Sequence, residues 1–202
     1  MNRNDLRQQL ERFVPFNEQE ENDLELIRQA LAADNIFSRE NETMHMTASA
    51  WVVNRAYSKV LMAYHRIYDS WAWLGGHADG QEDLLAVAVR EVQEESGLSD
   101  VTPVSDEILS VEIIPVSGHE KKGHYVSSHL HLNVTYLLQA DEAEPVHSRE
   151  EENKAVAWFT PEAALAASDE PWFVERIYPK LIARAVRNRD TVSGEEAELP
   201  VD

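Results

Sequence analysis

The stretch from Gly76 to Leu98 reads GHADGQEDLLAVAVREVQEESGL and determines how the rest of the chain is interpreted. Apolar residues recur in it at helical spacing, and Gly97 follows them, as a glycine commonly does where a helix ends. We therefore predict a helix from Glu82 to Ser96. One stripe of this helix is apolar and is expected to face the core.

The same helix carries three glutamates, Glu91, Glu94 and Glu95, at positions i, i+3 and i+4. Their carboxylates project from one arc of the helix surface, where like charges repel one another. A divalent cation would relieve this repulsion, and carboxylate oxygens suit magnesium or manganese. Arg90 supplies further compensation, and the backbone carbonyl at Gly76 could also reach the ion.

The whole stretch matches the Nudix box, Gx5Ex7REUxEExGU with U an aliphatic residue, at every specified position. From average residue frequencies, the chance of such a match anywhere in this chain is below roughly one in a million. The sequence therefore resembles a Nudix hydrolase, in order of elements from about His45 to Arg187. The matching positions are Gly76, Glu82, Arg90, Glu91, Val92, Glu94, Glu95, Gly97 and Leu98.

The resemblance implies an α/β (α+β) fold in which a mixed β-sheet is sandwiched between helices. It also implies Mg²⁺-dependent hydrolysis, with Mn²⁺ as the alternative ion, of a diphosphate linkage in a nucleoside diphosphate derivative or related small phosphorylated metabolite. By matching positions, Glu94 and Glu95 would be metal ligands, assisted by the Gly76 carbonyl. Glu91 would be a further ligand or the general base, and Arg90 would orient the carboxylates.

Three segments are expected along the chain: an N-terminal helical extension (1–40), the hydrolase domain (41–187) and an acidic, frayed tail (188–202). The extension should hold two helices separated near Pro15. Strands are predicted where β-rich sequence alternates, and two helices after Pro161, the second bent or divided at Pro179. The predicted strands are a hairpin spanning 45–68, followed by 108–116, 127–139 and 154–160.

A later acidic run, residues 150–152, precedes the last predicted strand. In many relatives a glutamate of this region completes the metal site or acts as the base, and among the three we favour Glu151 or Glu152. The alternative is a solvated charged loop.

His129 and His131 alternate with apolar residues, which places them on one face of a strand. That face either lines the substrate cleft or is the exposed side of an ordinary antiparallel strand. A histidine metal site is disfavoured because no third ligand lies nearby in the sequence.

Three further residues are candidates for substrate binding. Arg66 could contact phosphate or could be an ordinary surface arginine. Trp73 could stack on a base or could belong to the core. Lys121 lies in the loop 117–125, which is either a lid that contacts phosphate or a surface hairpin.

Composition excludes several functions. With 37 acidic and 18 basic residues the net charge is −19, so a large surface for a nucleic-acid polymer is not expected. The chain has no cysteine, which excludes the related isomerases that rely on a catalytic cysteine. Neither a signal peptide nor an apolar stretch long enough to span a membrane is present, which predicts a cytoplasmic protein.

Two alternatives stay open at this point. The chain could be a catalytically weak Nudix-fold module that binds ligand or regulates, although the intact box argues for an enzyme. The apolar faces of the N-terminal helices favour a homodimer. Sugar nucleotides, ADP-ribose, dinucleoside polyphosphates and modified nucleoside triphosphates are all compatible with the sequence.

Overall fold

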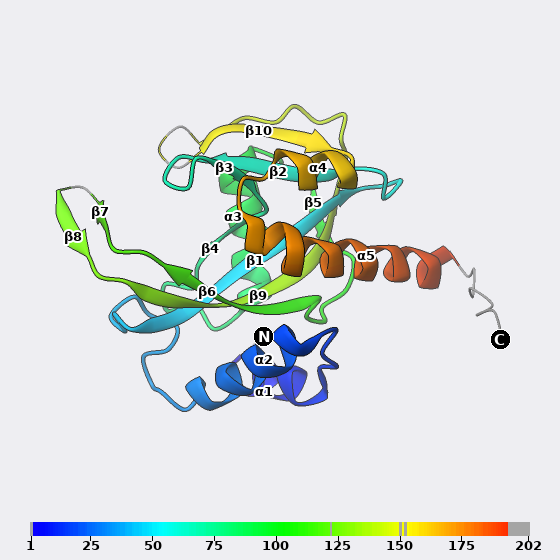
Figure 1. Cartoon of the computed structure of the whole chain (residues 1–202). Coiled ribbons are helices and arrows are strands. Elements are labelled where there is room, and N and C mark those ends of the chain that lie inside the picture. The colour runs from blue at the N-terminus through cyan, green and yellow to red at the C-terminus, as the bar shows by residue number, and fades with distance from the viewer. Residues whose placement is uncertain (1, 122, 150, 152, 194–202) are drawn as a thin grey trace.

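The computed structural model describes residues 2–121, 123–149, 151 and 153–193. Its centre is a mixed, eight-stranded sheet with helices on both faces, so the predicted fold class is confirmed (Figure 1). The strands of this sheet are β1 (Met44–Asn54), β2 (Val60–His65), β3 (Ser70–Ala72), β4 (Leu74–His77), β5 (Val101–Pro103), β6 (Ser110–Val116), β9 (His129–Ala140) and β10 (Asn153–Phe159).

The sheet is built around one parallel pair, β1 and β9, which runs from Met44 opposite Leu130 to Asn54 opposite Ala140. The main path of the sheet is β10-β2-β1-β9-β5, and β3, β4 and β6 pair with β2, β1 and β9. All pairs other than β1 with β9 are antiparallel. Because β1 is covered on both faces, nearly all of its residues are buried.

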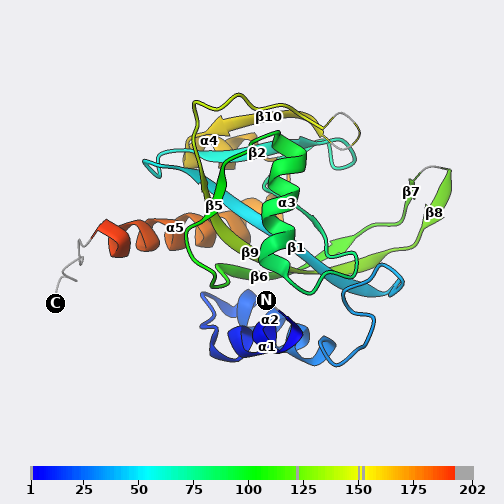
Figure 2. The same cartoon turned by 180° about the vertical axis from the view of Figure 1, so that it is seen from behind.

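Alternation along β1 divides the interior into two cores. Ala48 and Val52 belong to a core shared with α3 (Leu84–Ser96), whereas Trp51 and Val53 belong to a core shared with α5 (Tyr178–Ser193). Successive residues of a strand point to opposite faces, so the two cores lie on opposite sides of the sheet. Figures 1 and 2, related by a half turn, show α5 over one face and α3 over the other.

Helix α3 forms where the sequence predicts it, with a start two residues later. Asp83 is the N-cap, and its side chain accepts a hydrogen bond from the Ala86 N–H at 3.2 Å. Gly97 ends the helix with φ = 74°, a left-handed conformation that glycine adopts without a steric penalty.

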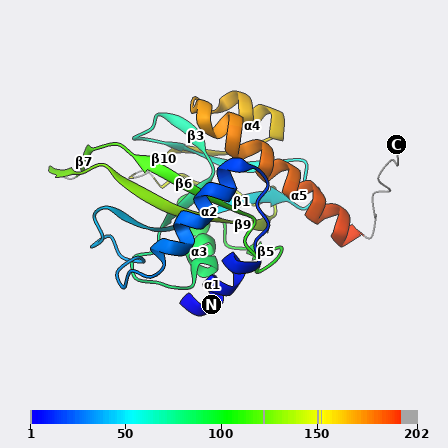
Figure 3. The ribbon, with the colours of Figure 1, turned by 60° about the horizontal axis from the view of Figure 1, so that its bottom comes forward.

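The N-terminal extension consists of α1 (Arg3–Arg12) and α2 (Glu18–Ala30), separated around Pro15 as predicted. The two helices lie below the sheet in the view of Figure 1 and come forward in Figure 3, where α2 runs in front of the sheet. Their buried apolar residues belong to the same core as α3, so the faces that favoured a homodimer are already covered within the chain. These residues are Leu6, Leu10, Leu24, Ile27 and Leu31.

Helix α2 also completes the hydrogen bonding of strand β6. The N–H of Val111 donates to Glu20 Oε1 at 3.2 Å, and the N–H of Ile113 donates to Asp23 Oδ2 at 2.9 Å. Side chains of α2 thus satisfy backbone groups of β6 that face away from β9. The extension therefore packs as part of the same folded unit, although it precedes the part of the sequence that resembles a Nudix hydrolase.

A buried ionic network joins α2 to α5. Lys180 Nζ lies 3.1 Å from Glu20 Oε1 and 3.0 Å from Glu112 Oε1, and the three side chains are 0–1% exposed. Arg184 donates to both oxygens of Glu20, at 2.8 and 2.9 Å. Burial alone would raise the pKa of Glu20, but Lys180 and Arg184 lower it overall.

The C-terminal part begins with α4 (Pro161–Ala167), followed by a π-helical segment, Phe173–Ile177, and then α5. The predicted irregularity near Pro179 is this π-helical segment. The predicted fraying from Asn188 is wrong for 188–193, because α5 continues to Ser193; the remainder of the predicted tail lies outside the described residues. Among the helices described, none is both long and apolar enough to cross a bilayer.

Candidate active site

Strand β4 brings the backbone of Gly76 against the carboxylate of Glu91. A Cβ atom placed on Gly76 would lie 2.5 Å from both Cδ and Oε2 of Glu91, closer than atoms can approach. Gly76 pairs with Ala48 of β1 and therefore faces α3. The absence of a side chain at Gly76 is what allows the carboxylate to sit against the strand.

Replacing Gly76 with alanine should displace this carboxylate and lower kcat by about 100-fold, the scale of effect expected from misplacing a group by about 1 Å. Gly118→Ala is the matched control, because its Cβ would meet the hydroxyl end of the Tyr125 ring, an exposed side chain that can move. Steady-state kinetics on both variants measures the effect. Equal activities would show that the position of the Glu91 carboxylate is not critical.

Glu95 is held from two sides and is 5% exposed. Its Oε2 accepts a hydrogen bond from the Gly75 N–H at 3.1 Å, and its Oε1 accepts one from Asn153 Nδ2 at 3.0 Å. Each carboxylate oxygen has a second lone pair, so these bonds fix the orientation of Glu95 without exhausting its capacity to bind a cation.

Arg90 connects the loop to the helix. It donates to Gln81 Oε1 at 3.1 Å, to the His77 carbonyl at 3.2 Å and to Glu91 Oε1 at 2.7 Å. A planar guanidinium with several donors is suited to hold these three acceptors in one geometry. Arg90 thereby fixes both the box loop and the Glu91 carboxylate.

Glu94 is the most exposed of the three box carboxylates, and its Oε1 lies 3.8 Å from Arg90 Nε. Its side chain is 44% exposed, compared with 12% for Glu91, and its Oε2 lies 2.9 Å from Arg149 Nη1. The structure therefore brings Glu91 and Glu95 together with the Gly75–Gly76 backbone, and places Glu94 at the outer border of this group.

Two further candidates, Glu151 and Arg66, lie at the end of the sheet where Asn153 contacts Glu95. Glu151 is exposed in the turn before β10, two residues from Asn153. Asn153 of β10 pairs with His65, the last residue of β2. Arg66 follows His65 and is exposed in the turn between β2 and β3. Glu152 lies outside the described residues.

Two other candidates for substrate binding lie away from this group. Trp73 is 7% exposed and packs edge-on against Phe173 and Tyr178 in the core under α5, so the core alternative for this residue describes its position. The segment with Lys121 forms a hairpin of β7 (His119–Lys121) and β8 (His124–Val126), which projects from the sheet (Figure 1). The side chain of Lys121 lies outside the described part of the chain.

His129 and His131 occupy one face of β9 and meet two histidines from other strands. His45 on β1 pairs in register with His131, and His77 on β4 pairs with Thr47, two residues further along β1. Burial, followed by the neighbouring imidazoles, lowers the pKa of His131 to about 2. Burial also lowers the pKa of His45, so both rings are neutral at pH 7.

Sequence reasoning missed Asn153 and Arg149, which contact Glu95 and Glu94. Asn153 follows the acidic run that drew attention to this region, but nothing local distinguishes it from a loop asparagine. Its burial at 1% exposure follows from the pairing of β10 with β2, a long-range contact.

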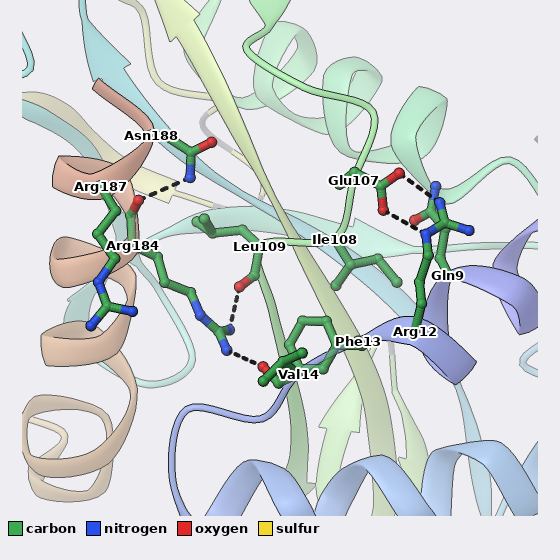
Figure 4. A pocket seen from close by; sticks show the side chains of 10 residues that line it. All are labelled: Gln9, Arg12, Phe13, Val14, Glu107, Ile108, Leu109, Arg184, Arg187 and Asn188. Atoms are coloured by element: carbon green, nitrogen blue, oxygen red, sulfur yellow. Dashed lines mark hydrogen bonds and ion pairs between the residues drawn. The ribbon is translucent and has the colours of Figure 1, made fainter. Parts of the chain in front are cut away.

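A pocket of about 380 Å³ lies elsewhere, between α1, the segment before β6, and α5 (Figure 4). None of its lining residues comes from the stretch 76–98, and two of its arginines are already engaged. Arg12 pairs with Glu107 at 2.6 Å, and Arg184 donates to the Val14 carbonyl at 2.8 Å. The pocket is lined by Gln9, Arg12, Phe13, Val14, Glu107, Ile108, Leu109, Arg184, Arg187 and Asn188.

The group around Gly76 fits a hard divalent cation. The ligand atoms it offers are carboxylate oxygens of Glu91 and Glu95 and a backbone carbonyl, the atoms that magnesium and manganese prefer. Because Gly76 has no side chain, the carboxylate of Glu91 can lie directly against the backbone of β4.

Comparisons with known proteins bear on the family and the fold of this chain. A family model described as NUDIX domain matches residues 43–181. No curated protein gives a significant match. The E. coli dihydroneopterin triphosphate pyrophosphohydrolase is similar in structure, with a TM-score of 0.51, 16% identity and coverage of 68% of this chain and 94% of that one. A C. elegans Ap4A hydrolase aligns with a TM-score of 0.49, 17% identity and coverage of 74% and 98%.

Proposed function

This chain belongs to the Nudix family and is a hydrolase that acts on phosphorus anhydrides. From this premise we propose that it cleaves a diphosphate linkage in a nucleoside diphosphate derivative or related small phosphorylated metabolite, and that the reaction depends on Mg²⁺. Mn²⁺ is the alternative ion. The observation that carries this proposal is the contact between the Gly76 backbone and the Glu91 carboxylate, with Glu95 fixed beside it.

In this proposal Glu91, Glu95 and the Gly76 carbonyl would hold the ion, and Glu94 would contribute from the outer border. When bound, the ion would neutralise phosphate charge and make an attacking water more acidic. With a net charge of −19, the protein needs a bound cation at this site, because an anionic substrate would otherwise be repelled by a strongly acidic protein.

The protein's own residues supply the geometry. Arg90 keeps the Glu91 carboxylate turned toward Gly76, and Asn153 together with the Gly75 N–H keeps Glu95 in place. Glu91 and Glu151 are both candidates for the base that accepts a proton from water. Arg66, exposed at the same end of the sheet, is suited to hold a phosphate of the substrate.

The proposal is tested by assaying the purified chain against a panel of sugar nucleotides, ADP-ribose, dinucleoside polyphosphates and modified nucleoside triphosphates. Phosphate-containing products are measured with Mg²⁺ and after removal of divalent ions by a chelator. We expect turnover of at least one class, lost with the chelator and restored by Mg²⁺ or Mn²⁺.

Turnover that continues unchanged after removal of divalent ions would contradict the metal dependence. Ligand binding without turnover across the whole panel would favour the alternative of a binding or regulatory module. Product analysis identifies which linkage breaks, because the phosphates of the substrate are divided between the two products according to the position of the broken P–O–P bond.

A further inference from the structure

A second group of potential ligands lies on the opposite face of the sheet from α3. Gly76 pairs with Ala48, which packs toward α3, whereas the next residue, His77, pairs with Thr47. Consecutive residues of a strand point to opposite faces, so His77 points away from the Glu91 carboxylate. His45 lies on this same face, two residues before Thr47, and pairs with His131.

Three strands therefore bring three imidazoles together. One ring nitrogen from each of His45, His77 and His131 lies within 4.8 Å of the other two. The ring centroids are 4.8–5.2 Å apart. For a tetrahedral ion with bonds of about 2.0–2.1 Å to nitrogen, imidazole centroids would lie roughly 5 Å apart.

The hydrogen bonding of His45 leaves one of its two ring nitrogens able to bind a metal ion. Its Nδ1 lies 3.0 Å from the Asn41 carbonyl, and because a carbonyl only accepts, Nδ1 carries the proton. Nε2 then has a lone pair, it is buried, and it has no hydrogen-bond partner among the described residues. Donation of the other ring N–H to a carbonyl is the arrangement commonly found in metal-binding histidines.

A fourth imidazole lies next to this trio. His129 Nδ1 donates to the Ser127 carbonyl at 2.8 Å, which leaves its Nε2 as an acceptor. That Nε2 lies 3.1 Å from Nε2 of His131. The contact is made either by a proton on one of the two nitrogens or by a cation between the rings, and roughly 3.3 Å separates two nitrogens bound to one tetrahedral ion.

We propose that His45, His77 and His131 form a site for a borderline transition-metal ion of the Zn²⁺ type, with His129 beside the fourth position. All of the offered ligand atoms are imidazole nitrogens, which suit Zn²⁺, Co²⁺, Ni²⁺ or Cu²⁺ better than Mg²⁺. The site is separate from the proposed Mg²⁺ site in both location and ligand chemistry, and it does not depend on the proposed function.

The test is titration of the metal-free protein with Co²⁺ in the presence of excess Mg²⁺, followed by visible absorption. We expect one equivalent of Co²⁺ to give the strong bands of a four-coordinate ion, and Zn²⁺ to displace it and raise Tm. His77→Ala and His131→Ala should each weaken Co²⁺ binding by more than the roughly 10–100-fold that follows loss of an outer-shell partner.

His124→Ala is the matched control, because His124 is exposed on the projecting hairpin and lies outside the cluster; it should bind Co²⁺ normally. Glu95→Gln, which alters the other site, should also keep the Co²⁺ bands. Circular dichroism verifies that each histidine variant is folded. His77 is half-buried, so His77→Ala should disturb the fold less than the same change at His45, which is buried. Absence of the bands in the unmodified protein, their persistence in folded His77→Ala and His131→Ala, or their loss in Glu95→Gln would overturn the proposal.

Discussion

Glu95→Gln is expected to lower kcat by about 10²–10³-fold, because an ion held by this carboxylate would contribute several kcal/mol to transition-state stabilisation. The substitution removes the negative charge. It also places an NH₂ group against one of two donors, the Gly75 N–H or Asn153 Nδ2, because both carboxylate oxygens currently accept. Steady-state kinetics over a range of Mg²⁺ concentrations measures the loss in kcat and the change in ion dependence.

Glu94→Gln is the comparison for this experiment, since it makes the same chemical change one residue away, at a carboxylate that would contribute to the ion only from the outer border. Glu94 is more exposed and paired with Arg149, so its variant should retain activity within about tenfold. An equally large loss in both variants would show that Glu94 is as central as the family pattern implies. Full activity in Glu95→Gln would remove Glu95 from the site altogether.

The largest expected effect on stability comes from Glu20→Gln, which should reduce the free energy of unfolding by about 3–5 kcal/mol. Glu20 accepts from Arg184 and lies within reach of Lys180, whose side chain is fully buried. Removing the carboxylate charge leaves buried cations with less compensation, which costs more than losing an exposed pair. Urea unfolding of the two proteins at pH 7 measures the difference.

Glu21→Gln, an exposed neighbour on the same helix, should change stability by less than about 0.5 kcal/mol.

The pH dependence of stability supplies a second check. The pKa of folded Glu20 is lowered from its ordinary value of 4.5, so its contribution is complete above pH 4.5 and is lost as pH falls through the folded pKa. The gap between unmodified protein and Glu20→Gln should therefore narrow in acid; a gap independent of pH would contradict this account.

The sequence was sufficient for those features that depend on local pattern. Helix α3 was predictable because apolar spacing, the glycine after its last residue and the box positions all occur within one short stretch. Strand alternation likewise located β1 and β9 to within a few residues. Their parallel pairing, which places residues about 86 positions apart side by side, has no local signature.

This limit explains why the grouping of four histidines could not be predicted from the sequence. A histidine metal site at His129 and His131 was not expected, because the two residues alone offer too few ligands. The structure supplies His45 and His77 from separate strands, through pairings that alternation alone does not reveal.

The buried ionic network was equally inaccessible to sequence reasoning. Glu20 lies in a helix rich in acidic residues, and Lys180 lies in a helix with several cations, so each resembles an ordinary surface charge. Their burial results from packing of α2 against β6 and α5, which pattern within either helix does not specify.

The contact between α2 and β6 has a consequence for how this chain behaves among its own copies. A strand whose outer N–H and C=O groups are unpaired is a template onto which a strand of another molecule can add. Here Glu20 and Asp23 occupy the N–H groups of Val111 and Ile113. A fragment beginning at residue 41 would lack these side chains, exposing β6 to intermolecular sheet growth. The first 40 residues thus cover a strand edge at which such growth could begin.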